Sequence, residues 1–299
     1  MAWIWTALSV VAFLYLLQEL LNLKKKKKLP PGPRGIPILG HFHLLGNNPH
    51  QDLYHLARKH GPIMHLRFGF VPTIVVSSPS GAELILKTHD LVFASRPHHE
   101  ASKYISYGQR GLVFGRYGSH WRNMRKLCTL ELLSNLRINQ FQTMRKAELG
   151  LLVSSLKQAA ETGEIVDLSL RVLGLSADMV CLMVFGRKYA DRDFDEKGFK
   201  AVFAEALEVA ARFNLGDYFP YLGVLDLQGL TRKMKRLSKT FDGFFEKVID
   251  DHLQNKQEKK QVEDFVDTMM AIVESGEVEF EFDRRHVKSL LLVILTFYT

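Results

Sequence analysis

The N-terminal segment, residues 1–23, constrains this chain more than any other feature. Its only charge is Glu19, and five consecutive lysines, Lys24 to Lys28, follow it. As an α-helix its apolar run extends about 33 Å, which matches the hydrocarbon core of a bilayer. Trp3 and Trp5 lie at one end and the lysines at the other, as in an anchor whose positive end faces the cytosol. We therefore expect a single transmembrane anchor followed by a cytosolic chain.

A cleaved signal peptide is the alternative for this segment. In a signal peptide the positive charge precedes the apolar run, and a cleavage site of small residues follows it. Here the lysines come after the apolar run. This order favours a retained anchor.

The net charge of +8 is concentrated beside the anchor, where Glu19 and Lys24 to Lys28 account for half of it. An acidic membrane surface explains this distribution better than a nucleic-acid backbone does, so we expect no nucleic-acid partner. The two cysteines, Cys128 and Cys181, are too few for a disulfide framework. They also stand in no metal-ligand spacing, so we expect no metal held directly by these residues.

Four prolines interrupt the chain after the lysines, in LPPGPRGIPILGH. Proline fixes φ and removes a backbone donor, so this stretch forms neither a helix nor an inner strand. We expect residues 24–40 to be a basic, proline-rich hinge, and residues 41–299 to form the folded domain.

The domain is predicted to be mainly α with a small β element. Residues 63–68 and 73–77 are strand-like and are separated by a turn at 69–72, and Ser78 with Pro79 opens a helix. Beyond Tyr117 the apolar spacing is helical. The expected helices there are 119–131, 137–161, 168–186, 196–212, 230–256, 262–274 and 284–299.

The segment YGSHWRNMRKLC, residues 117–128, is the most informative about chemistry. On a helix Trp121 and Arg125 lie on one face and present an indole N–H and a guanidinium together. Both groups are donors, which suits a carboxylate or phosphate ligand. The alternative is an arginine stacked on its own tryptophan by a cation–π contact, which is the more common meaning of such spacing taken alone.

The same segment resembles the C-helix of a cytochrome P450, a haem-thiolate monooxygenase. Other stretches of the chain resemble the same family and occur in the family's order, over essentially the whole sequence. They are PPGP at 30–33, RKHGP at 58–62, SSPSGAELILK at 77–87, FASRP at 93–97, and DYFPYLGVLDLQG at 217–229, which resembles the F–G connection of the plant microsomal class.

This resemblance implies a cytochrome P450 fold with haem (heme) as the cofactor. By the same resemblance Trp121 and Arg125 bind the haem propionates, and Arg96 in FASRP is a further propionate donor. The loop 98–114 and the stretch 206–215 resemble the first two substrate-recognition regions. The candidate pocket residues in them are Tyr104, Tyr107, Val113 and Phe213, each of which has plain packing as its alternative.

The activity implied by the resemblance is the insertion of one oxygen atom from O2 into a small lipophilic molecule. The electrons come from NADPH through a membrane-bound NADPH–cytochrome reductase. The implied location is the endoplasmic reticulum membrane, with one span and a cytosolic domain. Arg122 and Lys126 are candidate groups for reductase docking, with a solvated helix face as the alternative.

The family's thiolate ligand has no counterpart in these residues. HVKSLLLVILTFYT, residues 286–299, aligns with the start of the I helix, whereas the ExxR pair and the FxxGxRxC loop of the family follow later in its sequences. Cys128 and Cys181 both resemble buried core thiols. We therefore expect the 299-residue chain to be a partial, inactive catalytic domain, with a non-catalytic membrane-anchored product as the alternative.

Overall fold

The computed structural model describes residues 29–189, 199–254, 262–276, 278 and 280–298. Eight positions of the expected anchor are also described, all helical and all exposed. They are Trp3, Trp5, Thr6, Ser9, Val10, Ala12, Phe13 and Leu17. The rest of the expected anchor and the lysine run lie outside the described residues, so the transmembrane helix stays a prediction.

The chain divides into two compact units. The first contains the residues up to Ala94 together with Leu215–Leu225, and the second contains Ser95–Asn214 and Asp226–Thr299. The expected division into an anchor, a hinge and a domain at 23 and 40 remains a separate prediction.

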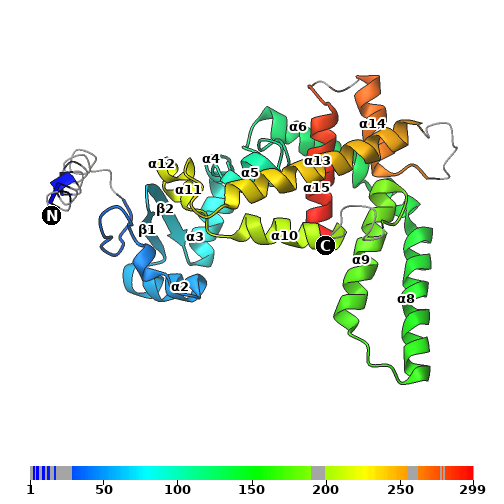
Figure 1. Cartoon of the computed structure of the whole chain (residues 1–299), viewed down its shortest axis with the longest axis horizontal. Coiled ribbons are helices and arrows are strands. Elements are labelled where there is room, and N and C mark those ends of the chain that lie inside the picture. Colours follow the sequence, from blue (N-terminus) through cyan, green and yellow to red (C-terminus); the bar gives the residue numbers. More distant parts are fainter. Residues whose placement is uncertain are drawn as a thin grey trace. The chain divides into compact units, whose positions relative to one another are not determined.

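The first unit is built around the hairpin of β1 and β2 (Figure 1). The strands pair antiparallel, from Ile63 opposite Val76 to Phe68 opposite Val71. The unit's elements are η1 (Phe42–Leu44), α2 (Pro49–His60), β1 (Ile63–Phe68), β2 (Val71–Val76), α3 (Pro79–Glu83), η2 (Leu84–Thr88), α4 (Asp90–Phe93), α11 (Leu215–Tyr218) and α12 (Pro220–Gly223).

The turn of this hairpin is tighter than the sequence predicts, because only Gly69 and Phe70 separate the strands. Pro72 lies within β2, where the open edge of a two-stranded sheet tolerates the missing N–H. Gly69 has a φ of +58°, and a Cβ at this position would lie 2.6 Å from the carbonyl oxygen of Tyr218. A side chain therefore fits here neither in conformation nor in space.

The proline-rich segment packs along β1. The N–H of His65 donates to the carbonyl of Pro31 at 2.9 Å. The His41 ring lies between the two stretches, since its Nδ1 accepts from the N–H of Arg67 at 2.8 Å and its Nε2 lies 3.0 Å from the carbonyl of Pro33. This pattern requires the tautomer with the proton on Nε2. From Pro31 onward the proline-rich segment therefore contacts the folded unit.

The second unit is helical in its described part, and α13 crosses α15 within it (Figure 1). Leu290, Leu291 and Leu295 of α15 are completely buried. The elements are α5 (Glu100–Ile105), α6 (Ser119–Leu127), η3 (Cys128–Leu132), α7 (Asn135–Gln140), α8 (Gln142–Thr162), α9 (Leu168–Phe185), α10 (Phe199–Ala211), α13 (Leu230–Gln254), α14 (Phe265–Ser275) and α15 (Arg284–Tyr298).

Among the described residues, α9 is the helix whose length and composition would let it span a membrane. Its C-terminal half contributes Val180, Val184 and Phe185 to the buried core of the second unit, whereas Leu168, Leu170 and Leu173 in its N-terminal half are exposed. The predicted fold class, mainly α with a small β element, is confirmed.

Candidate functional site

Trp121 and Arg125 lie on the same face of α6, as their spacing predicts. The Arg125 guanidinium carbon lies 5.3 Å from the centre of the Trp121 ring. The indole is half-buried, whereas Arg125 is exposed. The cation–π contact is therefore present, and it leaves the guanidinium N–H groups accessible to an anionic ligand.

The indole N–H of Trp121 donates to the carbonyl of Leu112 at 2.9 Å. The Nε of Arg96 donates to the carbonyl of the next residue, Val113, at 3.2 Å. Two of the predicted cofactor residues thus bind adjacent carbonyls of one loop, and Arg125 stacks on the ring of one of them, Trp121. The structure brings together the three residues that the sequence proposed.

The loop at Gly111 to Gly115 is tightly packed. The N–H of Gly115 donates to the carbonyl of Gly111 at 3.0 Å. A Cβ on Gly115 would lie 2.5 Å from that carbonyl oxygen, and a Cβ on Gly111 would lie 3.2 Å from the Val293 side chain of α15. The two glycines allow the loop to lie between Trp121 and α15.

The donors of this cluster fit an acidic group such as the haem propionates. Within the described part of the chain, neither Arg96 nor Arg125 is paired with a carboxylate. Two guanidinium groups that have no carboxylate partner among the described residues favour an anionic ligand. For Trp121 to join them, its N–H would exchange the Leu112 carbonyl for the ligand oxygen.

The four predicted substrate residues differ in exposure, and none of them lines the apolar cavity at Leu112 and Leu290. Tyr104 is half-buried, and the ammonium groups of Lys103 and Lys235 lie 5.2 Å and 5.5 Å from its ring centre. Tyr107 and Val113 are half-buried in the same region of the second unit. Phe213 is 46% exposed. The substrate role of these residues stays a prediction.

An apolar cavity of about 470 Å³ lies in the second unit. Leu112, the acceptor of the Trp121 bond, is part of its wall. Other wall residues come from η3, α9 and α15, among them Cys128, Val184 and Leu290. Sequence reasoning missed this cavity, because its lining has the same apolar pattern as a helix core.

Neither cysteine resembles a thiolate ligand in this structure. Cys128 and Cys181 are buried. Burial raises the pKa of the Cys128 thiol to about 12. A thiol with this pKa is protonated at neutral pH, and only the thiolate is a good metal ligand.

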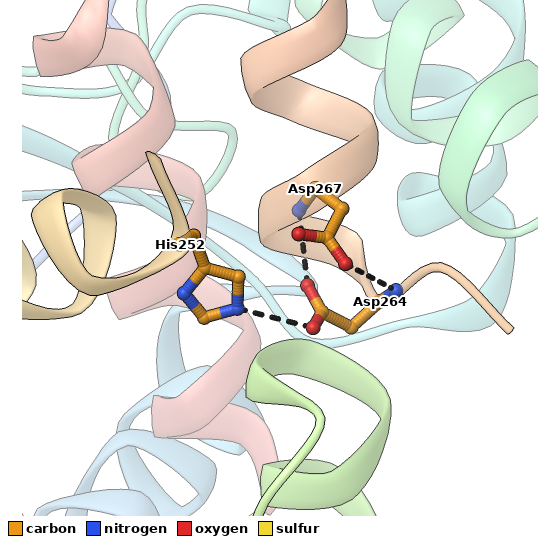
Figure 2. Close-up of side chains that lie close together, drawn as sticks. All are labelled: His252, Asp264 and Asp267. Carbon is orange, nitrogen blue, oxygen red and sulfur yellow. Dashed lines mark hydrogen bonds and ion pairs between the residues drawn. The ribbon is translucent and has the colours of Figure 1, made fainter. Parts of the chain in front are cut away.

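His252, Asp264 and Asp267 lie close enough together to resemble a metal site, but their atoms serve a helix cap (Figure 2). Asp264 accepts from the N–H of Asp267 at 2.9 Å, and Asp267 accepts from the N–H of Asp264 at 3.3 Å. This is the capping box of α14.

His252 joins this cap to α13. Its Nε2 lies 3.0 Å from the Asp264 carboxylate, and its Nδ1 lies 2.7 Å from the carbonyl of Val248. Both ring nitrogens face acceptors, so the geometry calls for an imidazolium with both protons present. The cluster therefore holds the end of α13 against the start of α14.

Comparison with known proteins identifies the relatives of this chain. The family model for cytochrome P450 matches residues 30–296. Cytochrome P450 CYP736A12 of Panax ginseng is 47% identical over 279 residues, which are 92% of this chain and 55% of that protein. Cytochrome P450 71B10 of Arabidopsis thaliana is 36% identical over an alignment of 299 residues that covers 97% of this chain and 59% of that protein.

A relative named for its reaction is the 5-epiaristolochene 1,3-dihydroxylase of Nicotiana tabacum. It is 35% identical over 290 residues, which are 94% of this chain and 57% of that protein. The chain thus spans between about half and three fifths of the length of these curated relatives.

Proposed function

Since this chain belongs to the cytochrome P450 family, of plant type, we propose that it forms part of a haem-dependent monooxygenase acting on a small lipophilic molecule. Dioxygen and NADPH-derived electrons are the co-substrates of the proposed reaction. The dihydroxylase among the relatives supports an oxygen-inserting reaction.

The observation that carries the proposal is the cluster around the loop carbonyls of Leu112 and Val113. Arg96 and Arg125 have no carboxylate partner in the described residues, and the indole N–H of Trp121, which donates to Leu112 in this structure, belongs to the same cluster. In the proposed complex the guanidinium groups neutralise the two propionates, and the indole N–H donates to one of them. The bound haem supplies the oxygen chemistry.

The proposed electron donor is an NADPH–cytochrome reductase at the endoplasmic reticulum membrane. Arg122 and Lys126 lie on α6 and are exposed, so they are available to an acidic partner. The apolar N-terminal segment and its lysines support a single membrane span with a cytosolic domain.

We further propose that these 299 residues alone do not form a thiolate-ligated haem. The two cysteines support this proposal, because both are buried and the raised pKa of Cys128 keeps its thiol protonated. The competing proposal is a non-catalytic, membrane-anchored product. A band at the thiolate position in the reduced-CO spectrum of this chain would contradict our proposal.

The main test measures haem binding in a chain completed with a thiolate-ligating segment of the cytochrome P450 family. We expect Arg125→Gln to weaken haem binding on the order of tenfold, because one charge-assisted hydrogen bond is lost. Arg122→Gln is the matched control on the same helix and should keep its haem but accept electrons more slowly from the reductase. Equal haem affinity in Arg125→Gln and the unmodified protein would overturn the propionate assignment.

A further inference from the structure

An alternating chain of charges joins α13 to α15. Asp242, Glu246 and Asp250 follow one another at helical spacing on α13, opposite Arg284 and Lys288 on α15. The ammonium of Lys288 lies 2.5 Å from Asp242 and 2.6 Å from Glu246. The guanidinium of Arg284 lies 3.0 Å from both Glu246 and Asp250. These five side chains form two linked sets of ion pairs. The inner rung is Lys288 with Asp242 and Glu246, and the outer rung is Arg284 with Glu246 and Asp250.

The inner rung is buried on the lysine side. The Lys288 side chain is 5% exposed, whereas Arg284 in the outer rung is 41% exposed. Burial by itself lowers the pKa of Lys288, but the hydrogen bonds to Asp242 and Glu246 outweigh it, so that the pKa lies above its usual range. Lys288 therefore remains an ammonium, although its neighbours Val287 and Leu291 are completely buried apolar residues.

Burying an ammonium group between two helices costs desolvation free energy. An apolar residue of similar volume often gives equal or greater stability at such a position. The buried charge of Lys288 therefore suggests a role beyond packing. The aromatic ring next to this ammonium is that of Tyr107.

Tyr107 contacts Lys288 from a strained turn. The Lys288 ammonium lies 5.8 Å from the centre of the Tyr107 ring. Tyr107, Gly108 and Gln109 have φ values of 52°, 76° and 66°. Residues other than glycine rarely adopt this left-handed backbone conformation, so Tyr107 and Gln109 are strained. Such strain persists only where surrounding contacts impose it.

Contacts at both ends hold this turn. The Gln109 amide donates to the carbonyl of Pro97 at 3.2 Å and lies 3.1 Å from the hydroxyl of Ser102. At the other end, the Tyr107 ring rests on Lys288. Burial and the nearby Asp242 carboxylate raise the pKa of Tyr107, so its hydroxyl stays neutral beside the charges.

We propose that Lys288 is a positioning residue for the substrate-recognition loop: clamped by Asp242 and Glu246, its ammonium fixes the Tyr107 ring and thereby the strained turn at 107–109. The turn leads directly into Leu112 and Val113, the two carbonyls bound by Trp121 and Arg96. The clamp thus preorganises the loop that selects the lipophilic substrate. The specificity part of this inference rests on the proposed monooxygenase function.

The outer rung supplies a matched control. Arg284→Met and Lys288→Met each remove one cation from the same ladder, but only Lys288 lies against Tyr107. We expect hydrogen exchange of the backbone at 106–112 to accelerate about tenfold in Lys288→Met and to stay within twofold of the unmodified protein in Arg284→Met. Lys288→Arg, which keeps the charge, should fall between them. Equal acceleration in the two methionine variants would overturn the proposal.

A second variant covers the case in which Lys288→Met does not fold. Tyr107→Leu removes the ring and leaves both rungs in place, so it should accelerate exchange at 106–112 as Lys288→Met does. Unchanged exchange in Tyr107→Leu contradicts the proposal.

Ligand binding tests the consequence for the pocket. In the same completed chain loaded with haem, the dissociation constant of 4-phenylimidazole should rise about tenfold in Tyr107→Leu and Lys288→Met, while that of imidazole stays within twofold. An equal change in the dissociation constants of both probes would contradict the proposed role of Lys288 in substrate specificity. The exchange measurement needs no haem, so a failure of haem binding would count against the proposed function and leave the test of the clamp intact.

Discussion

The indole nitrogen of Trp121 lies 2.9 Å from the backbone carbonyl of Leu112, nine residues earlier in the chain. This bond ties α6 to the loop that precedes it, and Leu112 continues into the wall of the apolar cavity. The helix expected to bind the cofactor and the loop expected to meet the substrate are therefore linked through one donor.

Trp121→Phe should lower the free energy of unfolding by about 1 kcal/mol, because a half-buried hydrogen bond is lost while most of the ring is kept. Urea unfolding followed by circular dichroism measures the change. Tyr54→Phe, at a side chain that is 56% exposed, is the control and should change the value by less than about 0.5 kcal/mol. Equal effects in the two variants would show that the Leu112 bond adds nothing to stability.

The α14 cap separates two contributions of one carboxylate. Asp264→Ala removes both the N-cap and the partner of His252, so we expect a loss on the order of 2 kcal/mol in the free energy of unfolding. Asp264→Asn retains an N-cap acceptor but not the charge beside His252. Its loss should be about half as large. Unchanged stability in Asp264→Asn would argue that His252 is not an imidazolium.

The lowered pKa of His286 predicts that the free energy of unfolding decreases as the pH falls below neutrality. Burial lowers its pKa below 6.5, and His120 and Arg110 act in the same direction against the opposing Asp283. The unfolded chain then binds a proton more readily than the folded one, so the stabilising contribution is present above pH 6.5 and is lost below it.

Thermal unfolding at pH 7.5 and pH 5.5 measures this dependence. His286→Asn should narrow the difference in melting temperature between the two conditions, whereas His89→Asn, at an exposed position, should leave it as it is. His65 also has a lowered pKa, so part of the dependence should remain in His286→Asn.

Cys128 should resist alkylation in the folded protein. With a thiol pKa of about 12, roughly one molecule in ten thousand carries the thiolate at pH 8. Iodoacetamide labelling followed by peptide mass spectrometry should show an unmodified Cys128 in buffer and a modified one in 8 M urea. Rapid labelling in buffer would mean that the thiol is accessible and more acidic than its burial indicates.

Helical periodicity located the long helices of the second unit well. The predicted helix 230–256 corresponds to α13 at Leu230–Gln254, and 168–186 corresponds to α9 at Leu168–Phe185. The predicted helix 137–161 is instead divided at Phe141 into α7 and α8. The Phe141 ring lies 5.8 Å from that of Phe265, a contact between residues far apart in sequence that a local pattern does not contain.

The same distinction holds at the candidate site. The spacing of Trp121 and Arg125 predicted a shared face, since that depends on helix geometry alone. The acceptor at Leu112 is a backbone carbonyl, which no residue type reveals. Lys288 and Asp242 are 46 residues apart, and only the crossing of α13 and α15 brings them together.

The attachment of the proline-rich segment to β1 shortens the connection between the predicted anchor and the first unit. Backbone pairing with His65 begins at Pro31, so an anchor that ends at residue 23 leaves only residues 24–30 as connection. Even fully extended, seven residues reach at most about 25 Å. For an anchor inserted as the sequence predicts, a connection of that reach would keep the strands of this unit close to the lipid headgroups.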